Sequence, residues 1–176
     1  AVIFEDDEQS GTANGGTGKS LLVDAMGQLR QSVMIDGKRF DPLKDFAWQR
    51  VTPQTNIILI DDVASSFRFD ELFNVITGGI SVNRKNKPEF YLSVSNGHTM
   101  ILTTNEVVRG SGNSSQRRQI VFSVFKYFSA DRTPVDEYGM LFFGDWTADE
   151  WAKFDNFMLG CAQMYHQHGI IKTNKV

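Results

Sequence analysis

The sequence predicts an α/β domain whose sheet is mainly parallel. Short runs of β-branched and other apolar residues, of the kind that form buried strands, recur along the chain. Segments with apolar residues at helical spacing separate several of these runs. Strands that alternate with helices favour a parallel sheet, because each parallel connection usually contains a helix.

The expected elements follow in chain order. Strands are predicted at "AVIF" (1–4), "VMID" (33–36), "NIILIDD" (56–62), "TMILTTN" (99–105) and "QIVFSVF" (119–125). Helices are predicted at 19–32, 43–50, 69–77 and 147–169, with a loop or short helix at 110–118. The alternating segment 80–94 predicts a β-hairpin. In the last helix, Thr147 and Glu150 have the spacing of a capping box.

Composition limits the classes of protein to consider. The chain has 176 residues, 41% of them hydrophobic and 22% charged, which is typical of a globular protein. We expect a core domain at 1–126 and a C-terminal extension at 127–176, whose long amphipathic helix packs on the core. The net charge of −3 argues against a domain that is basic all over, but a few residues on one loop can still bind nucleic acid.

The same composition bears on location. Cys161 has no partner for an internal disulfide, no apolar run is long enough to span a membrane, and no secretory leader is visible. These features predict an intracellular protein, of a bacterial cytoplasm or an infected host cell. The chain begins at Ala1 inside an apolar stretch, which indicates a piece of a longer protein.

The segment "ANGGTGKS" predicts a phosphate-binding loop. Its glycines allow the backbone N–H groups to point at phosphate oxygens, at the positive end of the following helix. Lys19 is expected to reach the β- and γ-phosphates of ATP, and the Ser20 hydroxyl to hold Mg²⁺. The alternative is an ordinary glycine-rich turn before a helix. The expected nucleotide-binding residues are Asn14, Gly15, Gly16, Thr17, Gly18, Lys19 and Ser20.

Two later strands are expected to deliver polar side chains to this loop. "IILIDD" ends in Asp61, which we expect to hold the metal through water, and Asp62, which we expect to polarise an attacking water. Two aspartates in a row leave open which one is the base. "MILTTNE" ends in Asn105, whose amide can lie between the γ-phosphate and that water, although asparagine is also common where a strand turns.

Two basic clusters complete the set of candidates. Arg117 and Arg118 could supply an arginine to the γ-phosphate of a neighbouring subunit, or could be a solvated basic pair. In the hairpin, Arg84, Lys85 and Lys87 concentrate positive charge at the tip, where they could bind a DNA backbone or serve only solubility.

These motifs in this order resemble the superfamily 3 helicases, which are AAA+-related motors of small DNA viruses, phages and plasmids. "ANGGTGKS" resembles motif A, "IILIDD" motif B, "GGISVNRKNKPEF" the motif B-prime hairpin, "MILTTNE" motif C and "QRRQIVF" the arginine-finger segment. The resemblance covers residues 1 to about 126. It is strongest to the primase–helicases of phages and mobile elements.

The resemblance implies a P-loop NTPase fold of the AAA+ type, with a five-stranded parallel core. It also implies a ring, usually a hexamer, with ATP sites between subunits, and 3′-to-5′ movement on single-stranded DNA. A primase or origin-binding module can lie on the same chain in such proteins. The residues that match the family's functional positions are Lys19, Ser20, Asp61, Asp62, Asn105, Arg118, Lys85 and Lys87. The polar segment before the glycines is longer than in the family.

Two other classes of function share part of this pattern. A nucleotide-dependent switch or scaffold would bind ATP and assemble without unwinding DNA. A small-molecule or nucleotide kinase would have the phosphate loop but would need neither the basic hairpin nor Asn105. DNA-stimulated hydrolysis of ATP separates the helicase from both.

Overall fold

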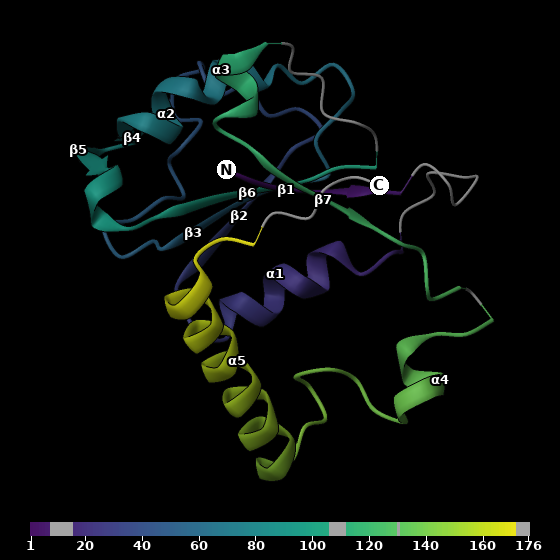
Figure 1. Ribbon diagram of the computed structural model, residues 1–176. Coiled ribbons are helices and arrows are strands. Elements are labelled where there is room, and N and C mark those ends of the chain that lie inside the picture. The colour runs from purple at the N-terminus through teal and green to yellow at the C-terminus, as the bar shows by residue number, and fades with distance from the viewer. Residues whose placement is uncertain (8–15, 106–111, 130, 172–176) are drawn as a thin grey trace. The chain divides into compact units, whose positions relative to one another are not determined.

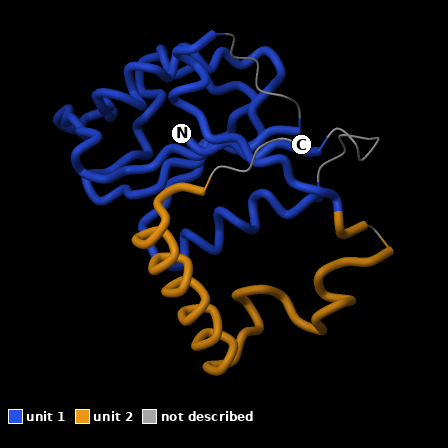
Figure 2. The backbone as a smooth tube through the Cα atoms, in the orientation of Figure 1, with its two compact units in different colours: residues 1–126 blue, residues 127–176 orange. Residues whose placement is uncertain are grey.

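The computed structural model describes residues 1–7, 16–105, 112–129 and 131–171. Its chain forms two compact units, residues 1–126 and residues 127–176, which Figure 2 shows in different colours. The first unit contains the sheet, Lys19 and the basic hairpin.

The first unit is built on a five-stranded sheet in which every pairing is parallel. The strand order across the sheet is β2-β3-β6-β1-β7. The strands are β1 (Val2–Asp6), β2 (Ser32–Asp36), β3 (Ile57–Asp61), β6 (Thr99–Thr103) and β7 (Ile120–Val124). The predicted α/β class, with a mainly parallel sheet of five strands flanked by helices, is therefore confirmed.

The interior strand β3, which lies between β2 and β6, is buried on both faces, which explains its uninterrupted apolar sequence. Ile58 and Ile60 join the larger core cluster, which also contains Phe69, whereas Ile57 and Leu59 join a smaller cluster with Val23. Because side chains alternate along a strand, the two clusters lie on opposite faces of the sheet.

Helices cover both faces. The helix α1 (Lys19–Gly27) lies against one face, and α2 (Phe73–Thr77) and α3 (Asn113–Gln116) lie on the other side (Figure 1). The predicted helix at 69–77 is in fact a 3₁₀ turn, η2 (Phe69–Leu72), that continues into α2. A second 3₁₀ turn, η3 (Val94–Asn96), precedes β6.

The predicted hairpin is confirmed, as an antiparallel pair of β4 (Gly79–Arg84) and β5 (Lys87–Ser93). Ile80, Val82 and Leu92 are buried and anchor it to the larger core cluster. Its two-residue turn is Lys85–Asn86, and Asn86 has a left-handed φ of 58°, which asparagine tolerates well. The anchored strands thus present a charged tip.

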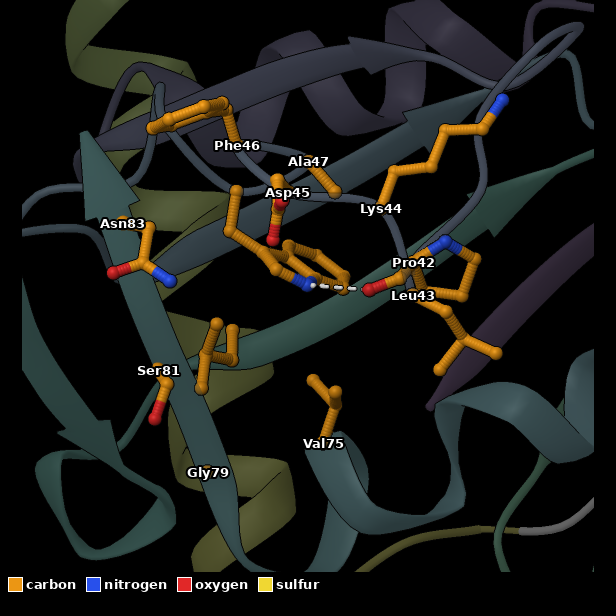
Figure 3. A pocket seen from close by; sticks show the side chains of 12 residues that line it. Pro42, Leu43, Lys44, Asp45, Phe46, Ala47, Val75, Gly79, Ser81 and Asn83 are labelled. Carbon is orange, nitrogen blue, oxygen red and sulfur yellow. Dashed lines mark hydrogen bonds between the residues drawn. The ribbon is translucent and has the colours of Figure 1, made fainter. Parts of the chain in front are cut away.

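The prediction of a helix at 43–50 is wrong. The segment instead forms successive four-residue turns, each closed by a bond between residues three apart, such as Ala47 N–H to Lys44 C=O at 3.1 Å, and Phe46 has a left-handed φ of 63°. A buried bond within the segment stabilises this course: the Trp48 indole donates to the Pro42 carbonyl at 3.2 Å (Figure 3). A pocket of about 250 Å³ lies between these turns and β4 (Figure 3).

The second unit contains α4 (Pro134–Tyr138) and α5 (Ala148–His168). The predicted capping box of the long helix is confirmed, because the Thr147 side chain accepts from the Glu150 backbone and the Glu150 side chain accepts from the Thr147 backbone. The helix α4 was not predicted, although Thr133 and Asp136 form a second capping box there. An aromatic cluster packs before and along the start of α5, formed by Phe143, Trp146, Trp151 and Phe154.

Candidate functional site

The candidate site lies at the carboxyl edge of the parallel sheet. Three adjacent strands, β3, β6 and β1, end there, in Asp61, Thr103 and Asp6. In open α/β sheets this edge is where ligands commonly bind. The helix α1 begins at the same edge, because Ser20 in its first turn donates to Asp61 at 3.1 Å.

Lys19 is the centre of a buried polar network. Its Nζ forms a short ion pair with Asp6 and donates to Thr17 Oγ1 at 3.1 Å and to Asn105 Oδ1 at 3.0 Å. The Lys19 side chain is only 7% exposed. Gly18, just before it, has a left-handed φ of 89°, which glycine adopts at no cost. The backbone therefore turns directly into α1 and leaves Lys19 over the sheet edge.

Asp61 lies among hydroxyl groups. Besides the Ser20 bond, its Oδ1 accepts a 2.6 Å bond from Thr103 Oγ1, which fixes the carboxylate. Mg²⁺ prefers oxygen ligands and is usually held by one or two protein groups together with phosphates. Ser20 and Asp61 fit that requirement. Among the described residues no cluster of three or more His, Cys, Asp or Glu could hold a metal ion alone.

Asp62 is held in an unusual backbone conformation with φ 56°, which turns the chain at the end of β3. Its N–H donates to Thr103 Oγ1 at 2.8 Å, and its carboxylate accepts from Asn105 Nδ2 at 3.2 Å. Its other oxygen pairs with Lys38 at 2.9 Å. The hydrogen bond between Lys38 and Asp62, together with the negative charge of Asp62, raises the pKa of Lys38. Asn105 thus bridges Lys19 and Asp62.

Gly37 allows the close approach of the segments that follow β2 and β3. Its N–H donates to the Asp61 carbonyl, and a Cβ at this position would lie 2.6 Å from that carbonyl oxygen and 2.8 Å from Val63 N. Both are backbone atoms, so no side chain can move aside to make room.

Gly37→Ala is therefore expected to lower the free energy of unfolding by about 1–3 kcal/mol, through overpacking at the end of β3. Thermal unfolding followed by circular dichroism should show a midpoint lower by roughly 2–10 °C. The control is Gly160→Ala in α5, where a Cβ meets nothing within 4 Å. It should be neutral or stabilising by up to about 1 kcal/mol. Equal midpoints for the two variants would contradict the prediction.

The arginine pair takes no part in the Lys19 network. Arg118 stacks on the Phe73 ring at 4.8 Å and donates to the Ser114 carbonyl at 2.9 Å. Arg117 is exposed and donates to the Asn113 carbonyl at 3.2 Å. Neither bonds to Lys19 or Asp61 within the described part of this chain.

The three basic residues of the hairpin differ in exposure. Lys85 and Lys87 are exposed at the tip, whereas Arg84 is half-buried and lies over the Phe90 ring at 4.9 Å. The two lysines are therefore more accessible to solvent than Arg84.

Two of the predicted nucleotide-binding residues, Asn14 and Gly15, lie outside the described residues. Sequence reasoning missed three residues of the network, Asp6, Lys38 and Thr103. The sequence contained a signal for two of them, because Asp6 and Thr103 follow apolar runs at the carboxyl ends of β1 and β6, and the ends of parallel strands meet at one edge of a sheet. Lys38 follows β2 and had no such signal. No helix that the structure describes is long and apolar enough to cross a membrane.

Comparisons with known proteins give one family and a set of solved structures. The family described as "Family of unknown function (DUF5906)" matches residues 12–118. No curated protein matches the chain. Similar solved structures include "The A form apo structure of NrS-1 C terminal region-CTR", with a TM-score of 0.45, 20% identity, and coverage of 97% of this chain and 36% of that chain.

A second is "The A form apo structure of NrS-1 C terminal region-CTR(305-718)", with a TM-score of 0.45, 19% identity, and coverage of 98% and 36%. The chain spans about a third of the length of both. The family match, in contrast, covers more than half of the chain and includes Lys19, Asp61, Asp62 and Asn105. The chain therefore belongs to the DUF5906 family, a family of unknown function.

Proposed function

We propose that this chain is the ATP-hydrolysing motor domain of a DNA helicase of the superfamily 3 type, with a P-loop NTPase fold. One observation carries the proposal. Lys19, Ser20, Asp61 and Asn105 come from three separate segments and meet at one edge of a parallel sheet. A glycine-rich turn or a strand-end asparagine with only a local role needs no such meeting.

Each side chain has a role that follows from its chemistry. Lys19 binds the β- and γ-phosphates of ATP as a cation, with the N–H groups of the glycine-rich loop beside it. Ser20 and Asp61 hold Mg²⁺, which neutralises charge on the phosphates when it is bound. Asp62 orients the attacking water and accepts its proton, and Asn105 aligns Asp62 with Lys19.

The remaining roles need other copies of the chain and DNA. One of Arg117 and Arg118 completes the site of a neighbouring subunit in a ring, and Arg117 is the more exposed of the two. The full-length protein forms that ring, a hexamer in the usual arrangement, and carries a primase or origin-binding module. It works on replicating DNA of a virus, phage or mobile element inside the cell.

The hairpin tip is proposed to bind single-stranded DNA through phosphate contacts. Lys85→Ala with Lys87→Ala should weaken binding equally for all DNA sequences. It should also lower the slope of log affinity against log salt by roughly 0.7 for each lost contact. The measurement is fluorescence anisotropy of labelled oligonucleotides over a salt series.

The matched control is Arg68→Ala with Lys153→Ala, which removes two exposed positive charges elsewhere, 68% and 78% exposed. Hydrolysis of ATP without DNA should stay near that of the parent protein in both double variants. If affinity and salt slope fall equally in the two, the effect is one of net charge and the hairpin has no special role.

The experiment that tests the proposed function is ATP hydrolysis measured against protein concentration, with and without single-stranded DNA. A specific activity that rises with concentration and is stimulated by DNA supports an assembled motor. Binding without turnover would instead indicate a switch or scaffold. Phosphate transfer to an added acceptor, without DNA stimulation, would indicate a kinase.

A further inference from the structure

Asp6 is a buried carboxylate for which the proposed reaction has no use. It ends β1, its side chain is 4% exposed, and it forms an ion pair with Lys19 Nζ. The same oxygen, Oδ1, accepts a 2.7 Å bond from Thr17 Oγ1. Its second oxygen, Oδ2, is buried and accepts no hydrogen bond from the described residues.

The contacts of Lys19 show what this carboxylate does. A lysine ammonium has three N–H donors, and here the three acceptors are Asp6, Thr17 and Asn105. All three N–H donors of Lys19 that could bind a phosphate are therefore already hydrogen-bonded. A phosphate oxygen that binds Lys19 must replace one of these three acceptors. It then also lies close to the negative charge of Asp6, and the two negative charges repel each other in a site where water screens little.

We propose that Asp6 is an internal competitor for the phosphate-binding residues, which holds Lys19 and Thr17 in the nucleotide-free protein and must be displaced by a polyphosphate. The inference rests on the proposed function. It makes Asp6 a residue that sets nucleotide affinity and not one that takes part in hydrolysis. The same contacts stabilise the empty site, since a buried ammonium without a partner is costly.

Asp6→Asn removes the charge and keeps the shape of the side chain. The variant is expected to bind ATP, and also pyrophosphate in the absence of Mg²⁺, about 10- to 100-fold more tightly than the parent protein. This factor corresponds to the free energy of one charge-assisted hydrogen bond. Without ligand it should unfold at a lower temperature than the parent protein. With saturating pyrophosphate it should show the larger rise in unfolding temperature. Calorimetric titration of the full chain and thermal unfolding measure both effects.

The matched control is Glu5→Gln. Glu5 is the preceding residue of β1, is 3% exposed, and accepts from Ser123 on β7 and not from Lys19. It loses the same charge from the same buried strand, so affinity should change little. Equal tightening in both variants would overturn the proposal, because the effect would then belong to net charge.

A measurement on the parent protein covers the case in which Asp6→Asn does not fold. Pyrophosphate should shift the side-chain carboxyl ¹³C resonance of Asp6 strongly and that of Glu5 little. An unchanged Asp6 resonance at saturation overturns the proposal, as does unchanged or weaker affinity in a folded Asp6→Asn variant. In those cases the proposed function stands. If the parent protein binds neither ATP nor pyrophosphate, the proposed function itself fails.

Discussion

Lys19→Ala is expected to abolish ATP binding and hydrolysis, and also to destabilise the protein. Binding is lost because the Lys19 ammonium is the cation of the proposed phosphate site. Stability is lost because Asp6, 4% exposed, is left as a buried charge without its partner. Breaking a buried ion pair by removing one partner costs about 3–5 kcal/mol. The sequence alone predicts only the first effect, since it gives no sign that Lys19 is buried.

A second variant separates the two effects. Lys19→Ala combined with Asp6→Asn removes both charges, so the temperature of unfolding should recover most of the loss while ATP binding stays absent. Binding of a fluorescent ATP analogue and thermal unfolding, measured on both variants, test this. Normal hydrolysis by Lys19→Ala would exclude the phosphate-binding role of this loop. Equal stability of the single and double variants would show that the Asp6 pair contributes nothing to folding.

Asp62→Asn is expected to leave Mg²⁺–ATP bound and to slow hydrolysis about 10²- to 10⁴-fold, the usual contribution of a general base. The substitution should change the chemistry of the side chain with little effect on the fold. Asparagine has nearly the same shape, and it tolerates the left-handed φ of 56° at this position. The ion pair to Lys38 is also lost, but Lys38 is 69% exposed and such surface pairs contribute little to stability.

The comparison with Asp61→Asn assigns the two carboxylates. Asp61 contacts Ser20 and Thr103, so its loss should weaken the dependence of ATP binding on Mg²⁺. Single-turnover hydrolysis and ATP affinity over a Mg²⁺ series measure the two effects separately. If Asp61→Asn spares Mg²⁺ dependence and Asp62→Asn destroys it, the two roles are reversed.

The sequence by itself determined the α/β class and most elements of the sheet and the hairpin, and it singled out candidate residues that follow strands or the glycine-rich loop. These features are local: a buried strand needs a continuous apolar run, a hairpin needs alternation and a turn, and a helix start needs its cap. The prediction failed at 43–50, where the buried bond from Trp48 to Pro42 and the left-handed Phe46 override a short helical pattern.

Only the tertiary structure decided which side chains of the candidate site form hydrogen bonds and ion pairs with one another. Strand order places β1, which ends in Asp6, next to β6, with β3 on the far side of β6, and this order cannot be read from the spacing of motifs. The structure thus showed that Lys19 is buried and already paired, that Asn105 joins Lys19 to Asp62, and that Arg118 stacks on Phe73. Burial and ion pairing depend on segments far apart in the chain, whereas a motif records only residue types and their order.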